Sequence, residues 1–271
     1  MTRRRISKSP DDRALSEILE EAGISLTHPV KQVDTLSTGN AQLDRCTGGI
    51  PRGRITQLFG DWDTEAAKMR ICMQVLKNAQ EKPDDLVMFV DADRGISMKD
   101  VPEDLRNPAA FLIVRPGSTE GLFSVVQAMV QAESVAAIVV HSIAALVPEV
   151  EASTPFVVDA PAGLHRATIA NHLLALTRSL HKSRTAVVLT DQTRHKIYAH
   201  GDPTATTGGP AVANAASLRI HLEHRAEIYK AGPEPAEHWG ARVRATVVKS
   251  KSSAPYRTCA FNVLRGRPSQ K

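Results

Sequence analysis

Residues 54–70 read RITQLFGDWDTEAAKMR, which we interpret as a strand, a turn and the start of a helix. The segment 54–59 predicts a short strand, and residues 66–80 predict a helix. A strand that runs through a turn into a helix N-terminus forms an anion-binding site, because the first backbone N–H groups of the helix point toward the ligand. The stretch therefore predicts an α/β fold with an anion site at the carboxyl end of this strand.

Most of the chemistry of a phosphate-binding loop is missing from this turn. A working loop has a second glycine, then Lys, then Ser or Thr, and its lysine lies six positions after the first glycine. Here Lys68 lies eight positions after Gly60, follows Ala67, and is followed by Met69, which offers no oxygen to a metal. The turn also carries three acids that oppose a polyanion: Asp61, Asp63 and Glu65.

The composition sets limits on the class of protein. The 271 residues suit one large α/β domain with a small N-terminal extension, and 42% hydrophobic residues can form a sizeable core. A net charge of +5 is compatible with nucleic acid, but 4% aromatics offer few stacking platforms. Three distant cysteines, Cys46, Cys72 and Cys259, favour a reducing cytoplasm over a zinc site or disulfide framework. The longest apolar run, 135–147, is too short to span a membrane.

The pattern along the chain predicts a doubly wound α/β fold, with a mostly parallel sheet, an antiparallel edge and a short N-terminal helix extension. Strands are predicted at 55–59, 86–91, 111–115, 136–141, 185–190, 217–222, 242–249 and 257–264. Helices are predicted at 11–22, 39–46, 66–80, 118–133 and 164–182, and long loops at 149–163 and 197–212. This divides the chain into a basic tail, helix and linker (1–34), a core (35–265) and a basic C-terminal tail (266–271).

Several segments, in order and with similar spacing, resemble the bacterial RecA family. They include GGIPRGRI at 48–55, FVDAD at 89–93, DQTRHKI at 191–197 and TTGG at 206–209, with further matches at 36–44, 138–146, 201–203 and 247–256. The resemblance covers about residues 35–265 and implies a RecA-type ATPase core that assembles as a helical filament on DNA. It also implies RecA or RecA-like subunits as partners.

The resemblance places altered residues at two positions of the ATPase site. The strand-end Asp that supports magnesium in the family corresponds to His141, and an imidazole lacks the charge that a hard cation prefers. The general base, a Glu in the family, corresponds to the shorter Asp93. We therefore expect no metal site, a protein that is not an enzyme, and at most weak ATP binding at a remnant site of Gly60, Lys68 and Gln192. Compensation by Lys68 and a shifted acid is the alternative.

The resemblance also assigns DNA-binding and interface residues. Positions at the start and end of the second DNA loop match Arg194, His195, Lys196, Thr207, Gly208 and Gly209. Lysines that reach the neighbour's phosphates in the family match Lys249 and Lys251, for which a solvated basic strand edge is the alternative. The apolar stripe of the N-terminal helix, Leu15, Ile18 and Leu19, is expected either to dock on the next subunit or to pack on its own core.

Three functions remain open at this point. The first is a catalytically inactive RecA-like regulator of DNA repair, recombination or damage-induced mutagenesis, similar to ImuA-type proteins, with a translesion polymerase assembly among its partners. The second is a divergent ATP-dependent recombinase with residual nucleotide binding. The third is a cap that stops filament growth. DNA-stimulated ATP turnover separates the first from the second.

Overall fold

The computed structural model describes residues 21, 33–82, 84–97, 100–102, 105, 109–153, 164–195, 204–230 and 238–264. By its contacts the chain divides into Met1–Val33 and Asp34–Lys271, and the second unit contains every strand of the sheet described. The predicted docking residues Leu15, Ile18 and Leu19 lie outside the described residues, as do 196–203 and 265–271. The division of the chain at 34 and 265 stays a prediction.

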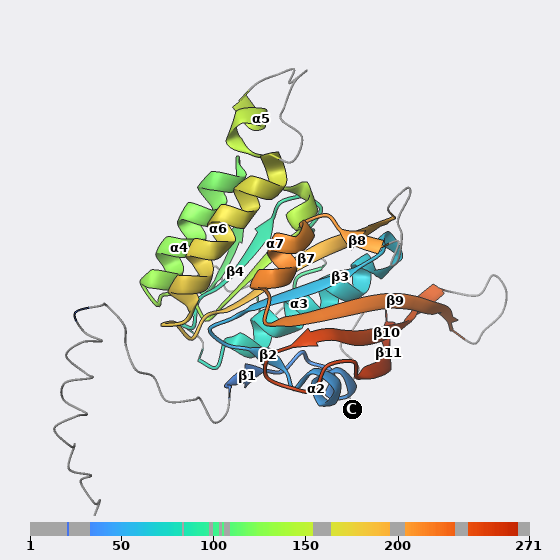
Figure 1. Cartoon of the computed structure of the whole chain (residues 1–271). Helices are drawn as coiled ribbons and strands as arrows, with labels where there is room; N and C mark the ends of the chain where they lie inside the picture. Colours follow the sequence, from blue (N-terminus) through green and yellow to red (C-terminus); the bar gives the residue numbers. More distant parts are fainter. Residues whose placement is uncertain are drawn as a thin grey trace, which may run out of the picture. The chain divides into compact units, whose positions relative to one another are not determined.

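The centre of the fold is a mixed sheet in the order β11-β10-β9-β3-β7-β6-β4-β5 (Figure 1). From β9 to β5 the neighbouring strands are parallel, whereas β9, β10 and β11 are antiparallel. The strands are β3 (Ile55–Gly60), β4 (Val87–Asp91), β5 (Phe111–Val114), β6 (Ala137–His141), β7 (Ala186–His195), β9 (Leu218–Tyr229), β10 (His238–Ser250) and β11 (Thr258–Leu264). The predicted α/β class with an antiparallel edge is confirmed.

Two short pairings lie beside this path. Strand β1 (Thr35–Leu36) pairs with β2 (Ile50–Pro51), and β8 (Thr204–Thr206) pairs antiparallel with the end of β7. The β7–β8 pairing brings Arg194 opposite Ala205. It therefore joins the two ends of the segment that the resemblance assigns to DNA.

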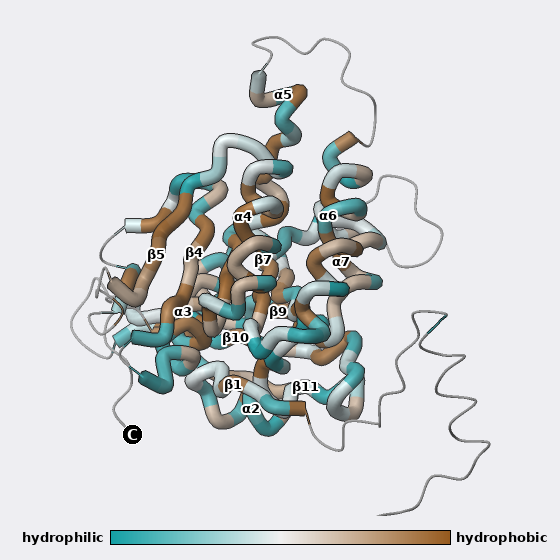
Figure 2. The backbone as a smooth tube through the Cα atoms, turned by 90° about the vertical axis from the view of Figure 1, so that its left-hand side faces the viewer, coloured by the Kyte–Doolittle hydropathy of each residue, from teal (hydrophilic) through white to brown (hydrophobic). Residues whose placement is uncertain are grey.

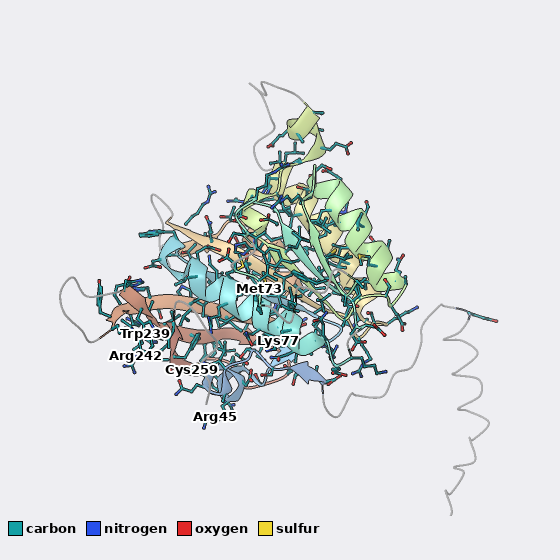
Figure 3. The ribbon with its side chains drawn as sticks, turned by 180° about the vertical axis from the view of Figure 1, so that it is seen from behind. Arg45, Met73, Lys77, Trp239, Arg242 and Cys259 are labelled. Carbon is teal, nitrogen blue, oxygen red and sulfur yellow. The ribbon has the colours of Figure 1, made fainter. Side chains whose placement is uncertain are left out.

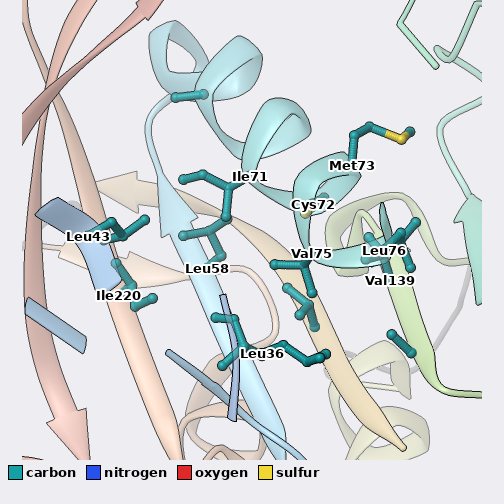
Figure 4. Packing of buried hydrophobic residues seen from close by; sticks show 14 of the residues in the cluster. Leu36, Leu43, Leu58, Ile71, Cys72, Met73, Val75, Leu76, Val139 and Ile220 are labelled. Atoms are coloured by element: carbon teal, nitrogen blue, oxygen red, sulfur yellow. The ribbon is translucent and has the colours of Figure 1, made fainter. Parts of the chain in front are cut away.

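Helices cover both faces of the sheet because its central strands are apolar on both faces (Figure 2). In β6, Ile138 and Val140 pack in the cluster under α4 (Thr119–Gln131), α6 (Leu164–Leu180) and α7 (Gly209–Ala215). Ala137 and Val139 pack in the other cluster, with α2 (Ala41–Thr47) and α3 (Glu65–Ala79). Figure 4 shows this second cluster, in which Ile71 of α3 lies beside Leu58 of β3. Alternate residues of β6 therefore pack into two different hydrophobic clusters, one on each face of the sheet.

The hairpin of β9 and β10 is longer than the sequence predicted. The predicted strands 217–222 and 242–249 were too short, because the pairing continues to Tyr229 and begins at His238. Residues 223–229 are mostly polar and lie exposed or half-buried, so no apolar alternation marks them as a strand.

The predicted loops 149–163 and 197–212 were partly wrong. The first begins with the short helix α5 (Glu149–Ser153), and the second ends in α7, which starts at Gly209. Pro210 lies in the first turn of α7, where the absence of an N–H group does not disturb the helix. None of the described helices has the length and hydropathy that a bilayer crossing requires.

Candidate functional site

The turn after β3 is held tightly against the neighbouring strand. A Cβ atom added at Gly60 would lie 2.4 Å from the backbone oxygen of Leu222 and 2.6 Å from the Thr64 hydroxyl oxygen. A 3₁₀ turn, Trp62–Thr64, follows, and the Thr64 hydroxyl donates to the backbone oxygen of Asp61. Because Thr64 therefore does not cap α3, no side-chain oxygen satisfies the first N–H groups of that helix at its N-cap.

The Lys68 side chain is completely buried at the carboxyl end of β3. Its Nζ atom forms an ion pair with Glu65 Oε2 at 2.7 Å. It also donates to the backbone oxygens of Gly60 at 3.5 Å and Asp191 at 3.3 Å. A buried ammonium group is costly unless it is paired, and these three oxygens provide the pairing. The lysine therefore links the turn after β3 to the end of β7.

His141 contacts the same Glu65 carboxylate as Lys68, and Asp93 in turn contacts His141. His141 Nε2 lies 3.0 Å from Glu65 Oε1 and 3.6 Å from Asp93 Oδ2. Its other ring nitrogen is 2.9 Å from the Thr190 hydroxyl. Burial opposes ionisation of Glu65, but the hydrogen bond from His141 and the charge of Lys68 outweigh it and hold the pKa of Glu65 below its ordinary value. The site therefore contains an ionised carboxylate between a lysine and a histidine.

Asp191 connects this cluster to the glycine that precedes α7. Its carboxylate accepts hydrogen bonds from the backbone N–H of Gly208 at 3.1 Å, from Gln192 N–H at 2.8 Å and from Gln57 Nε2 at 2.9 Å. Burial raises the pKa of Asp191, and these hydrogen bonds oppose the shift without cancelling it. Arg219 Nε donates to Gln57 Oε1 at 2.6 Å, which extends the network to β9.

The residues assigned to the second DNA loop are only partly brought together by the described residues. Arg194 Nε donates to the Thr207 hydroxyl at 3.0 Å, and Thr207 N–H donates to the Gln192 backbone oxygen. Gly208 and Gly209 follow, where α7 begins. The side chain of His195 and the whole of Lys196 lie outside the described residues. Their DNA-binding role stays a prediction.

The two predicted interface lysines differ in surroundings. Lys249 Nζ donates to the backbone oxygens of Ala213 at 2.8 Å and Asn214 at 3.0 Å, so it caps the C-terminal end of α7. Burial and the neighbouring charges of Lys251 and Arg219 lower the pKa of Lys249. Lys251 is exposed. Lys249 thus has a role within its own subunit, and an interface role for either lysine stays a prediction.

The donor set fits a phosphate anion better than a magnesium ion. Lys68 already pairs with an anionic group, the Glu65 carboxylate, and phosphate oxygens offer the same kind of acceptor. Magnesium prefers oxygen ligands, yet Met69 packs against the core and His141 supplies nitrogen. Among the described residues, no group of three or more His, Cys, Asp or Glu side chains is placed to hold a metal ion.

Sequence reasoning found the positions of this site but not its connections. It treated His141 only as a residue that lacks the charge for a cation, whereas its ring contacts the side chains of Thr190, Glu65 and Asp93. It treated Glu65 only as an acid that opposes a polyanion. It also missed Asp191 and Gln57, although a glutamine within the buried strand β3 was a signal that a polar partner lies across the sheet.

Comparison with known proteins finds a family model and several relatives that match most of this chain. The chain matches the RecA N-terminal domain model over residues 15–268. It is 33% identical over 245 residues to Protein RecA of Wolinella succinogenes, covering 88% of this chain and 67% of that protein. It is 31% identical over 264 residues to Protein RecA of Aquifex aeolicus, covering 93% and 73%. With Protein RecA of Thermus aquaticus it shares 32% identity over 245 residues, covering 88% and 69%.

These relatives correct one expectation from the sequence. The prediction that the chain is not an enzyme is wrong, because relatives that match most of the chain are RecA proteins, which the resemblance describes as ATPases. The prediction gave the altered positions at Met69, Asp93 and His141 more weight than similarity along the remaining chain. The altered positions at Met69, Asp93 and His141 are therefore not sufficient grounds to infer an inactive protein.

Proposed function

Because this chain belongs to the RecA family, we propose that it is a divergent, nucleotide-dependent enzyme of DNA recombination and repair. In this proposal it assembles with RecA-type subunits on single-stranded DNA. Nucleotide phosphates are held at Lys68 and the start of α3, and DNA is held at the residues that follow β7. A bound nucleotide would supply phosphate oxygens as acceptors for these groups.

One observation supports the coupling between the two sites. The backbone oxygen of Asp191 accepts a hydrogen bond from Lys68, while the carboxylate of the same residue accepts from Gly208 and Gln192. A single residue therefore contacts both the lysine of the phosphate site and the backbone of the DNA segment. In this proposal, a change in the contacts of Lys68 therefore reaches the DNA segment through Asp191 alone.

The partners in this proposal follow from family membership and from the charges after β7. Arg194 is an exposed cation at the start of the DNA segment, whereas the Gly208 N–H at its end already donates to the Asp191 carboxylate. In this proposal, RecA-type subunits are the partners of the helix predicted at 11–22 and of Lys251. A translesion polymerase assembly, which the sequence suggested, has no support in the described residues.

The experiment is ATP turnover with and without single-stranded DNA, in the wild-type protein, Lys68→Met and Lys82→Met. Lys82 is exposed, so its replacement is the matched control. We expect DNA to stimulate turnover in the wild type and in Lys82→Met, and turnover to fall at least tenfold in Lys68→Met, on the order of the effect of one lost charge contact. Absence of DNA-stimulated turnover in the wild type would refute the proposed enzyme.

A further inference from the structure

A cavity of about 570 Å³ lies at the outer edge of β11 and shares no lining residue with the Lys68 site. It is lined by Gln42, Arg45 and Cys46 of α2, by Arg242 of β10, and by residues 257–260 at the start of β11. Figure 3 shows Arg45, Arg242 and Cys259 gathered beside one another at this end of the sheet. The cavity therefore joins a helix to the last strand of the sheet.

The cavity is lined by consecutive residues of β11 together with Arg242 of the neighbouring strand β10. Consecutive residues of a strand point to opposite faces, yet Thr258, Cys259 and Ala260 all line the cavity. In the strand order, β11 is a terminal strand, and among the described residues it pairs only with β10. An edge strand presents backbone N–H and C=O groups that can pair with another strand.

Positive charge surrounds this edge. Arg45, Arg242 and Arg257 are all exposed, and within the described part of the chain no ion pair joins them to a carboxylate. None of the lining residues is acidic. Burial and the neighbouring Cys46 thiol raise the pKa of Cys259 to about 12, so this thiol stays neutral near neutral pH. The charge of the arginines is therefore not offset inside the cavity.

We propose that the edge of β11 and its three arginines form a docking site for an extended acidic peptide segment of a partner protein. The segment adds a strand to β11, and its carboxylates pair with Arg45, Arg242 and Arg257. Nucleic acid fits less well, because no aromatic side chain lines the cavity to stack on bases. This proposal does not rest on the proposed nucleotide and DNA sites.

The test measures binding of fluorescent peptides to the full chain. The probe is a short peptide that alternates valine with glutamate, and the matched control peptide has glutamine in place of glutamate. A third peptide carries backbone N-methyl groups along one edge, which prevents strand pairing but keeps the charges. We expect only the first peptide to bind well, and we expect its binding to slow hydrogen exchange of the 258–264 amides.

Charge reversal identifies the binding residues. The double variant Arg242→Glu with Arg257→Glu is expected to weaken peptide binding about tenfold or more, because attraction becomes repulsion at two positions. Arg178→Glu, an exposed change on α6, is the control and should leave binding unchanged. Equal binding by the double variant and the wild type would overturn the proposal. A wild type that binds an oligonucleotide at this edge but not the peptide would also overturn it and indicate a nucleic-acid site.

Discussion

Lys68 Nζ lies 3.3 Å from the backbone oxygen of Asp191, although 123 residues separate the two along the chain. The parallel pairing of β3 with β7 produces this contact, because it sets Phe59 opposite Asp191 and Gly60 opposite Gln192. The carboxyl ends of the two strands therefore meet at one edge of the sheet, where the turn after β3 and the segment after β7 begin. Variants at this edge should change both stability and ligand binding.

Replacement of Lys68 by Met should destabilise the protein. The change removes a buried cation and leaves the Glu65 carboxylate with His141 as its remaining partner. Because Glu65 is about one-third exposed, we expect a loss of only about 1–3 kcal/mol in the free energy of unfolding. Urea titration measures it, with Lys82→Met as the control. An unchanged unfolding midpoint would show that the ion pair contributes nothing.

The Glu65 carboxylate should make the free energy of unfolding depend on pH in the acidic range. Its pKa in the folded protein lies below the ordinary value of 4.5, so its contribution is present above that pH and is lost as pH falls through the folded pKa. We expect Glu65→Gln to lower the free energy of unfolding at about pH 7 and to lower it less at about pH 4, below the ordinary pKa. Urea unfolding at both pH values checks this. Equal losses of unfolding free energy at the two pH values would indicate that Glu65 contributes through packing and not through its charge.

The close approach at Gly60 predicts intolerance of even a methyl group. In Gly60→Ala the new Cβ would lie 2.4 Å from the Leu222 backbone oxygen, so a strand must shift. We expect a loss of about 1–3 kcal/mol from this overpacking. Gly117→Ala is the matched control, because nothing lies within 4 Å of its added Cβ. Thermal melting of both variants measures this loss of stability. Equal melting temperatures for Gly60→Ala and Gly117→Ala would contradict the prediction.

Variants of Lys249 and Lys251 should distinguish a role within the chain from a role in binding another subunit. Lys249→Met removes two hydrogen bonds to the last carbonyls of α7 and should cost about 1–2 kcal/mol of unfolding free energy. Lys251→Met, two residues further on and exposed, should leave the monomer's stability unchanged. Chemical denaturation measures both. A larger loss in Lys251→Met than in Lys249→Met would contradict the capping role.

Arg194 should contribute charge to DNA binding. Arg194→Ala is expected to weaken binding of single-stranded DNA and to reduce the dependence of log affinity on log salt by about one. Arg178→Ala removes an exposed arginine on α6 and serves as the control. Fluorescence anisotropy over a range of salt concentrations gives both values. A salt dependence that does not change in Arg194→Ala would place the DNA elsewhere.

The sequence predicted β4 and β6 well because these buried strands are apolar and short, but it ended β7 at residue 190, before the polar residues that continue the strand to His195. Strands 86–91 and 136–141 were found within one residue, as β4 and β6. It failed for the β9–β10 hairpin, where polar residues pair far from the core. It also missed α7, whose first residues, Gly209 and Pro210, were interpreted as loop residues.

Within the site, the sequence identified the residues but not their partners. Lys68, Asp93, His141 and Gln192 were all chosen as site positions; Lys68 and His141 contact the Glu65 carboxylate, and Asp93 contacts His141. The contacts of Glu65 and Asp191 depend on which strands are neighbours, and no local pattern gives that information. The roles of these residues in binding stay predictions.

The most direct test is the affinity for single-stranded DNA measured with and without ATP, in the wild type and in Lys68→Met at a temperature where both are folded. If Lys68 and Asp191 couple the two sites, ATP changes the DNA affinity of the wild type severalfold and has no effect on the variant. If ATP changes the DNA affinity of both proteins equally, or of neither, the coupling through Asp191 does not exist.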